Sequence, residues 1–164
     1  MPSNPRTIVL CLGNDVRSDD GVGWDIALRL CEDPAPGCDV RRSGLSGFYL
    51  LDELTGYDRA IVVDAVKTGA HPPGTVLSFP LEAIGTPAGP SPHSVGLPAV
   101  VRLGRQSGVA LPATIHVVAV EVEDMDTIKV GLTPAVHAAV PVAVRTVRAI
   151  VAEPAEGTAP SREG

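Results

Sequence analysis

The chain has 164 residues, a formal net charge of -6 and a pI near 5.1, and 45% of its residues are hydrophobic while only 3% are aromatic. This length suits one domain, whose core must be built from Val, Ala, Leu and Ile rather than from rings. The acidic balance argues against a nucleic-acid partner, and apolar runs far shorter than the roughly 20 residues of a membrane span lead us to expect a cytoplasmic protein without a membrane partner.

The first half of the chain predicts two strands that are covered on both faces. Residues 7–12 are β-branched and continuously apolar, and so are residues 60–63, which Asp64 follows. The segments expected between them are a helix over 22–31, a short strand over 38–42 and a short helix over 47–54.

The helix over 22–31 has apolar residues on two faces, one of which includes Leu28 and Cys31. We therefore expect this helix to be well buried. Cys11, Cys31 and Cys38 lack the spacing of a zinc site or a disulfide framework, so we interpret them as buried, reduced thiols. Burial should raise the pKa of Cys11 and make it a poor nucleophile.

The second half predicts two further strands and two helices. The expected segments are a strand over 75–79, an irregular loop over 84–92, a helix over 94–107 capped by Ser94, a strand over 114–120, and a last helix that begins at Thr133-Pro134 and kinks at Pro141. Alternating strands and helices indicate an α/β sandwich of three layers, with a twisted, mostly parallel sheet between helices. Residues 7–152 should form the single domain, with a flexible N-terminus at 1–6 and a disordered tail at 153–164.

Three side chains are expected at the carboxyl edge of the sheet, where open α/β sheets bind ligands. Asp20 follows the first strand, Asp64 follows the second strong one, and His93 lies on a Gly/Pro-rich loop that can close over the same edge. Together they offer a metal ion two carboxylates and an imidazole, with open coordination positions. Plainer interpretations exist: Asp19 or Asp20 can cap the following helix, and Asp64 can be a turn residue. His93 can be a solvated side chain.

Four short motifs follow one another along the chain. They are Leu12-Gly13-Asn14-Asp15-Val16-Arg17-Ser18-Asp19-Asp20-Gly21-Val22-Gly23, Val62-Val63-Asp64-Ala65, Ser91-Pro92-His93-Ser94-Val95-Gly96-Leu97 and Gly131-Leu132-Thr133-Pro134. In order and spacing they resemble the hydrogenase maturation proteases, from about Thr7 to Val151. The resemblance implies a phosphorylase/hydrolase-like sandwich of a twisted sheet flanked by helices.

The resemblance also implies a function for the three side chains. Metal-coordinating positions of the family match Asp20, Asp64 and His93, which are therefore the metal-binding and catalytic candidates. Proteins similar to these are endopeptidases that remove a C-terminal extension from the large subunit of [NiFe] hydrogenase after nickel insertion. The expected partner is thus a large-subunit precursor, and the metal is nickel carried by that substrate. We expect a monomer with no tightly bound cofactor of its own.

Two positions depart from the family pattern and concern the expected substrate cleft. The family usually has Asp-Gly-Gly-Thr where this chain has Arg42-Ser43-Gly44-Leu45, so a cation replaces an acidic residue. Glu121 matches an acidic residue after the third strand, although Val122 stands where proline is common. We assign Asn14, Arg42, Gly44 and Glu121 to the substrate cleft.

Two other classes of function remain open at this point. Arg42 and the lack of a separate nucleophile fit a non-catalytic, metal-dependent binding module or chaperone for a hydrogenase precursor. The glycine-containing turn before the first helix offers amides to a phosphate, as in a nucleotide-binding domain, but Asp19 and Asp20 beside it would repel that anion.

Overall fold

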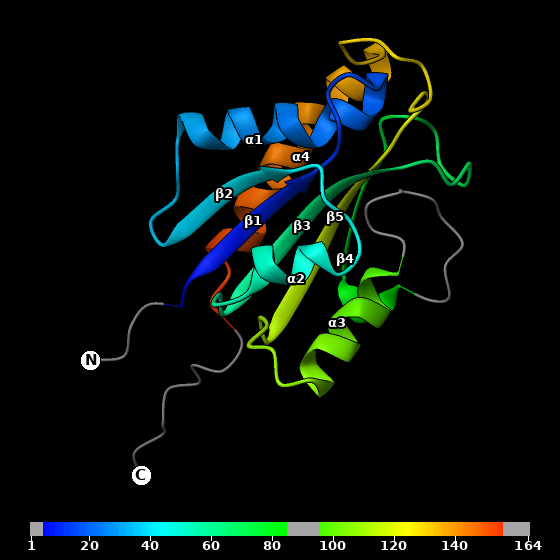
Figure 1. Ribbon diagram of the computed structural model, residues 1–164. Coiled ribbons are helices and arrows are strands. Elements are labelled where there is room, and N and C mark those ends of the chain that lie inside the picture. Colours follow the sequence, from blue (N-terminus) through cyan, green and yellow to red (C-terminus); the bar gives the residue numbers. More distant parts are fainter. Residues whose placement is uncertain (1–4, 85–95, 156–164) are drawn as a thin grey trace.

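The computed structural model describes residues 5–84 and 96–155, and a five-stranded sheet forms its middle layer (Figure 1). The strand order is β2-β1-β3-β5-β4. The strands are β1 (Thr7–Leu12), β2 (Cys38–Ser43), β3 (Arg59–Val66), β4 (Val76–Pro80) and β5 (Thr114–Glu121). All pairings are parallel except that of β4, which lies antiparallel to β5 at one edge. The predicted mostly parallel sheet is confirmed.

Helices cover both faces of this sheet, as the sequence predicts (Figure 1). One face carries α1 (Val22–Glu32) and α4 (Pro134–Ala152), and the other carries α2 (Tyr49–Leu54) and α3 (Leu97–Gln106). Within the described ranges, two 3-10 turns complete the elements, η1 (Ser18–Gly21) and η2 (Leu81–Ala83). The expected beginning of the third helix at Ser94 lies outside the described residues, and so does the expected loop over 84–92 apart from its first residue.

The core has two apolar layers because successive side chains of a strand point to opposite faces. In β3, Ile61 and Val63 pack into the layer under α1 and α4, whereas Ala60 and Val62 pack into the layer under α2 and α3. This alternation places the side chain of Asp64 on the α2 and α3 face. β3 continues to Val66, so Asp64 lies inside the strand near its carboxyl end rather than just after it.

Helix α4 is long and apolar enough, by length and composition alone, to cross a membrane. Its sequence has the spacing of a core helix, however, because its buried side chains recur along one face. Those side chains are Val136, Ala139, Val140, Ala143, Val147 and Ile150, and they pack with α1 against the sheet. The apolarity of α4 is therefore explained by this layer of the core.

Helix α1 is buried on one face only, which corrects the expectation from its sequence. Leu28 is 57% exposed, and Cys31 is exposed as well. Ile26 and Leu30 face the sheet and are buried, and α4 packs beside α1 without covering its outer side. The prediction of three buried thiols holds for Cys11 but is wrong for Cys31, and Cys38 is only half-buried.

Candidate functional site

The carboxyl edge of the sheet contains a point where the chain changes direction. From β1 the chain proceeds to β2 on one side and later to β3 on the other, so β1 and β3 are neighbours whose connections leave on opposite faces. Such a switch point leaves a crevice beyond the strand ends, where α/β proteins place their ligands. Asp20 follows β1 and Asp64 lies near the end of β3, so both lie at this edge of the sheet.

Asp64 is fully buried at the end of a central strand. Its backbone lies opposite Ala119 of β5, and its Oδ1 accepts a hydrogen bond from the amide of Ala65 at 2.9 Å. The neighbouring residues Val63 and Ala65 are held in the core on the other face of the sheet. The carboxylate therefore has a fixed direction.

Asp20 is 1% exposed and is carried by η1, which contacts β3. The amide of Asn14 donates to the carbonyl oxygen of Asp20 at 3.2 Å, which closes the turn after β1. Gly13 makes this closure possible, because a side chain at that position would collide with the Asp20 carbonyl oxygen. The φ angle of Gly13, 142°, also lies in the region that favours glycine. The Gly-Asn pair thus brings Asp20 back over the end of β1.

Asp19 is the residue whose role the sequence interpretation missed. It is completely buried, and its carboxylate receives hydrogen bonds from the amides of Glu123, Asp124 and Thr133 at 3.0, 3.0 and 2.7 Å. The hydroxyl of Thr133 also lies 3.0 and 2.9 Å from its two oxygens. Helix capping by Asp19 is therefore not its role: this side chain ties η1 to the loop between β5 and α4.

Thr133 is the N-cap residue of α4, as predicted, but it makes no side-chain cap hydrogen bond. Its hydroxyl donates a hydrogen bond to the carboxylate of Asp19 instead. Pro134 occupies the first helical turn, where the lack of an amide hydrogen costs no hydrogen bond. The fourth motif of the sequence thus meets the first one in space.

Glu121 is also buried, at 1% exposure, and its carboxylate makes hydrogen bonds to the protein itself. Its carboxylate accepts hydrogen bonds from the amides of Thr68 and Gly69 at 2.9 and 2.7 Å and from the Thr68 hydroxyl. Val66 and Glu121 are register partners in β3 and β5. Glu121 therefore fixes the segment after β3, two residues beyond the strand that carries Asp64.

The other residues assigned to the substrate cleft lie on the side of β1 and β2. Asn14 is half-buried, and its Oδ1 accepts a hydrogen bond from the amide of Val16 at 3.1 Å. Gly44 is exposed and lies near the carbonyl oxygen of Gly13. Arg42 is exposed and stacks on Trp24 of α1, with its guanidinium carbon 5.0 Å from the ring centre. Arg42 therefore points to the α1 face, whereas Asp64 points to the opposite one.

Of the three predicted metal ligands the structure describes Asp20 and Asp64, and His93 lies outside the described residues. Over residues 5–84 and 96–155, no group of three His, Cys, Asp or Glu side chains is arranged to hold a metal ion. The two described members, Asp20 and Asp64, are brought to adjacent strand ends. Two hard oxygen donors leave room for further ligands from another segment or from a substrate.

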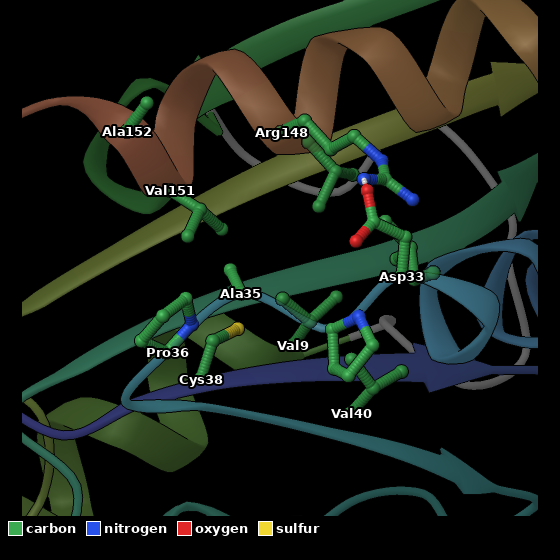
Figure 2. Close-up of a pocket in the computed structure, with 12 residues that line it drawn as sticks. Val9, Asp33, Ala35, Pro36, Cys38, Val40, Arg148, Val151 and Ala152 are labelled. Atoms are coloured by element: carbon green, nitrogen blue, oxygen red, sulfur yellow. Dashed lines mark hydrogen bonds and ion pairs between the residues drawn. The ribbon is translucent and has the colours of Figure 1, made fainter.

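An open pocket of about 470 Å³ lies elsewhere, between the carboxyl ends of α1 and α4 and the beginning of β2 (Figure 2). Its lining includes Cys38, Val40 and Val151, and an ion pair of 2.9 Å joins Asp33 to Arg148 beside it. The pocket lies toward the amino ends of the strands. It is thus separate from the edge that holds Asp20 and Asp64.

Comparison with known proteins identifies the family to which the chain belongs. A sequence profile described as hydrogenase maturation protease matches residues 32–150. The hydrogenase 2 maturation protease of Escherichia coli K12 is 30% identical over 154 residues, which cover 90% of this chain and 92% of that protein. The chain belongs to the hydrogenase maturation protease family.

Solved structures of maturation proteases share the fold. The hydrogenase maturating endopeptidase HybD from E. coli has a TM-score of 0.75 and 27% identity, covering 89% of this chain and 91% of that one. The [NiFe] hydrogenase maturation protease HybD from Thermococcus kodakarensis has a TM-score of 0.70 and 25% identity, covering 88% and 98%. The predicted family, fold and enzyme class are confirmed: this member of the family is an endopeptidase of hydrogenase maturation.

Proposed function

We propose that this endopeptidase removes the C-terminal extension of a [NiFe] hydrogenase large-subunit precursor after nickel insertion, and that Asp20, Asp64 and His93 read the nickel carried by that substrate. Family membership supports the class of reaction. The observation that carries the site is the pair of buried carboxylates at the ends of β1 and β3.

The chemistry of these donors suits recognition of an ion that belongs to another protein. Carboxylate and neutral imidazole groups bind a borderline divalent ion such as nickel, and a set without thiolate holds it loosely enough to release the product. The burial of Asp20 and Asp64 fixes their directions before the substrate arrives. The ion would thus align the precursor with the protease and report that nickel insertion is complete.

Recognition is the principal role that we assign to the trio, because the sequence offers no separate nucleophile. The same contacts also bring a carboxylate next to the peptide bond to be cut. There Asp20 or Asp64 can accept a proton from an attacking water, while the substrate's own ion polarises the scissile carbonyl. We also propose that the chain acts as a monomer in the cytoplasm, where its three free thiols stay reduced.

Intact mass of a large-subunit precursor, measured with and without nickel, tests this function. The wild-type chain should shorten the nickel-loaded precursor and leave the nickel-free precursor unchanged. Equal processing of both forms would contradict recognition of nickel. Binding without a change in mass would contradict hydrolysis.

Two substitutions test the site itself. Asp64→Asn keeps the oxygen that the Ala65 amide requires, and His93→Ala removes the imidazole. Each should reduce processing at least a hundredfold while the circular dichroism of the folded chain stays unchanged. Asp126→Asn is the matched control, since that side chain is 82% exposed on a neighbouring loop. Full activity in both site variants would remove the assignment.

A further inference from the structure

Exposed apolar side chains gather at the edge of the sheet that carries Asp20 and Asp64. Over the described residues, the large hydrophobic side chains with high exposure fall into two groups. Those in the segments that follow β1, β2 and β5 are Val16, Leu45, Phe48, Tyr49, Ile128 and Val130. The remainder, Leu28, Leu103 and Val142, are spread over three different helices. The concentration at one edge indicates an interaction surface.

The most exposed of these side chains are Ile128 at 86% and Val130 at 76%, on the loop between β5 and α4. Val16, at 46% exposure, lies on the loop after β1. We call residues 14–18 and 127–131 the apolar loop pair, because backbone hydrogen bonds join them. The amide of Lys129 donates to Val16 at 3.0 Å, and the amide of Ser18 donates to Lys129 at 2.7 Å.

The apolar loop pair is held in place by buried or ordered carboxylates. Asp19 binds the amides of Glu123 and Asp124, just before the loop, and that of Thr133, just after it. Asp124 in turn accepts hydrogen bonds from the amides of Asp126 and Thr127, both at 3.0 Å. A surface fixed in this way loses little conformational entropy on binding. The hydrogen bonds of Asp19 and Asp124 thus hold Ile128 and Val130 in fixed positions on the surface.

The loop pair is continuous with the site, since Ser18 is both its last residue on the β1 side and the first residue of η1, which carries Asp20. We therefore expect a protein substrate that places a metal ion at Asp20 to lie against this surface. Two carboxylates and an imidazole are also too small an area for specific protein binding, which usually buries about 800 Å² on each partner. Exposed β-branched residues on the loop joined to η1 supply apolar contact area of the kind found at interface centres.

We propose that Val16, Ile128 and Val130 form the docking surface for the folded body of the hydrogenase large-subunit precursor. The occupant is an apolar surface of the precursor next to its metal site, and the proposal rests on the function proposed above. The contact adds binding energy without taking part in the hydrolysis. It should therefore govern KM and the dissociation constant rather than kcat.

The double variant Ile128→Ser/Val130→Ser tests the docking surface in the full-length chain. Its KM for the nickel-loaded precursor should rise at least tenfold, with kcat within twofold of the wild type. The matched control is Leu28→Ser/Leu103→Ser, which removes two exposed side chains from α1 and α3, at 57% and 46% exposure. A KM within twofold of wild type in the loop variant, or an equal rise in the control, would overturn the proposal.

A direct measurement of precursor binding distinguishes the proposed docking surface from the proposed hydrolysis. If the wild-type chain binds the precursor without shortening it, the proposed hydrolysis fails, and a tenfold rise in Kd for the loop variant still supports docking. If the wild type cuts the precursor and the loop variant cuts it equally well at limiting concentrations, docking alone fails. Size-exclusion chromatography adds one more outcome. A wild-type dimer that the loop substitutions convert to a monomer would assign the surface to a second copy of this chain and overturn the proposal.

Discussion

The hydroxyl of Thr133 lies 3.0 and 2.9 Å from the two carboxylate oxygens of Asp19, and the amide of the same threonine donates to that carboxylate at 2.7 Å. This relationship joins the turn after β1 to the first residue before α4, two segments far apart in the sequence. It also orients the backbone on which the next residue, Asp20, is carried. The buried carboxylate of Asp19 thus supports the site without being assigned a role in the reaction.

Replacing Asp19 by Asn should destabilise the fold. The amide has one acceptor oxygen in place of two, so one or two of the three backbone donors lose their partner. We expect the free energy of unfolding to fall by about 2 to 4 kcal/mol, as for a lost network of charge-assisted hydrogen bonds. Urea unfolding followed by circular dichroism measures the change. The exposed Asp126→Asn should shift it by less than about 0.5 kcal/mol, and an equally small shift for Asp19→Asn would contradict this account.

A second prediction concerns the close approach of Gly13 to Asp20. In Gly13→Ala the new methyl group would collide with the Asp20 carbonyl oxygen and displace the turn. We expect kcat/KM for the nickel-loaded precursor to fall at least tenfold. Gly47→Ala is the control, because Gly47 also has a positive φ, 61°, but no atom within 4 Å of an added Cβ. It should lose about 1 kcal/mol of stability and keep its activity. Equal activities of the two variants would argue against a tightly closed turn.

The cysteines should differ strongly in reactivity toward maleimide. Burial raises the pKa of the Cys11 thiol well above its ordinary range, and burial together with Asp39 raises the pKa of Cys38 to a lesser extent. Cys31 is exposed. Brief labelling of the native chain near neutral pH should therefore modify Cys31 first, and Cys11 only after unfolding. Peptide mass mapping reports the order, and rapid native labelling of Cys11 would show that the core under α1 is open.

The loop that carries Ile128 should respond to acid through Asp124. Hydrogen bonds from Thr127, chiefly from its side chain, and from the amides of Thr127 and Asp126 lower the pKa of Asp124 to about 2. A carboxyl whose pKa is lower in the folded state stabilises that state above its ordinary pKa, near 4, and this contribution is lost as the pH falls toward 2. The difference in unfolding free energy between wild type and Asp124→Asn should thus be constant above about pH 5 and shrink below about pH 4. A difference that does not vary with pH would contradict the shift.

The sequence predicted those features that depend on local pattern. Apolar runs located β1 and β3, and the position of Asp20 and Asp64 after these runs was enough to predict that both lie at one edge of the sheet. The pairing of Asp19 with Thr133 was not predicted, because capping rules consider only amides within a turn and this partner is 114 residues away.

Two further features of the structure differ from the sequence prediction, and both depend on parts of the fold that are distant in the sequence. Leu28 and Cys31 look like a second buried face of α1, but burial depends on whether another layer exists to cover them, which the sequence of one helix does not reveal. Arg42 aligns with the expected cleft, yet its position in β2 directs its side chain to Trp24 on the other face. The place of His93 relative to the carboxylates stays a prediction.

The neighbouring strands β1 and β3 are not consecutive in the chain, since β2 and α2 are made between them. During synthesis, therefore, Asp20 leaves the ribosome well before Asp64, and no fragment that ends within α2 possesses both carboxylates. The proposed site is complete only when β3 pairs with β1. On the function proposed above, a chain with this topology is inactive until its sheet is assembled, so we expect incomplete copies to leave a precursor uncut.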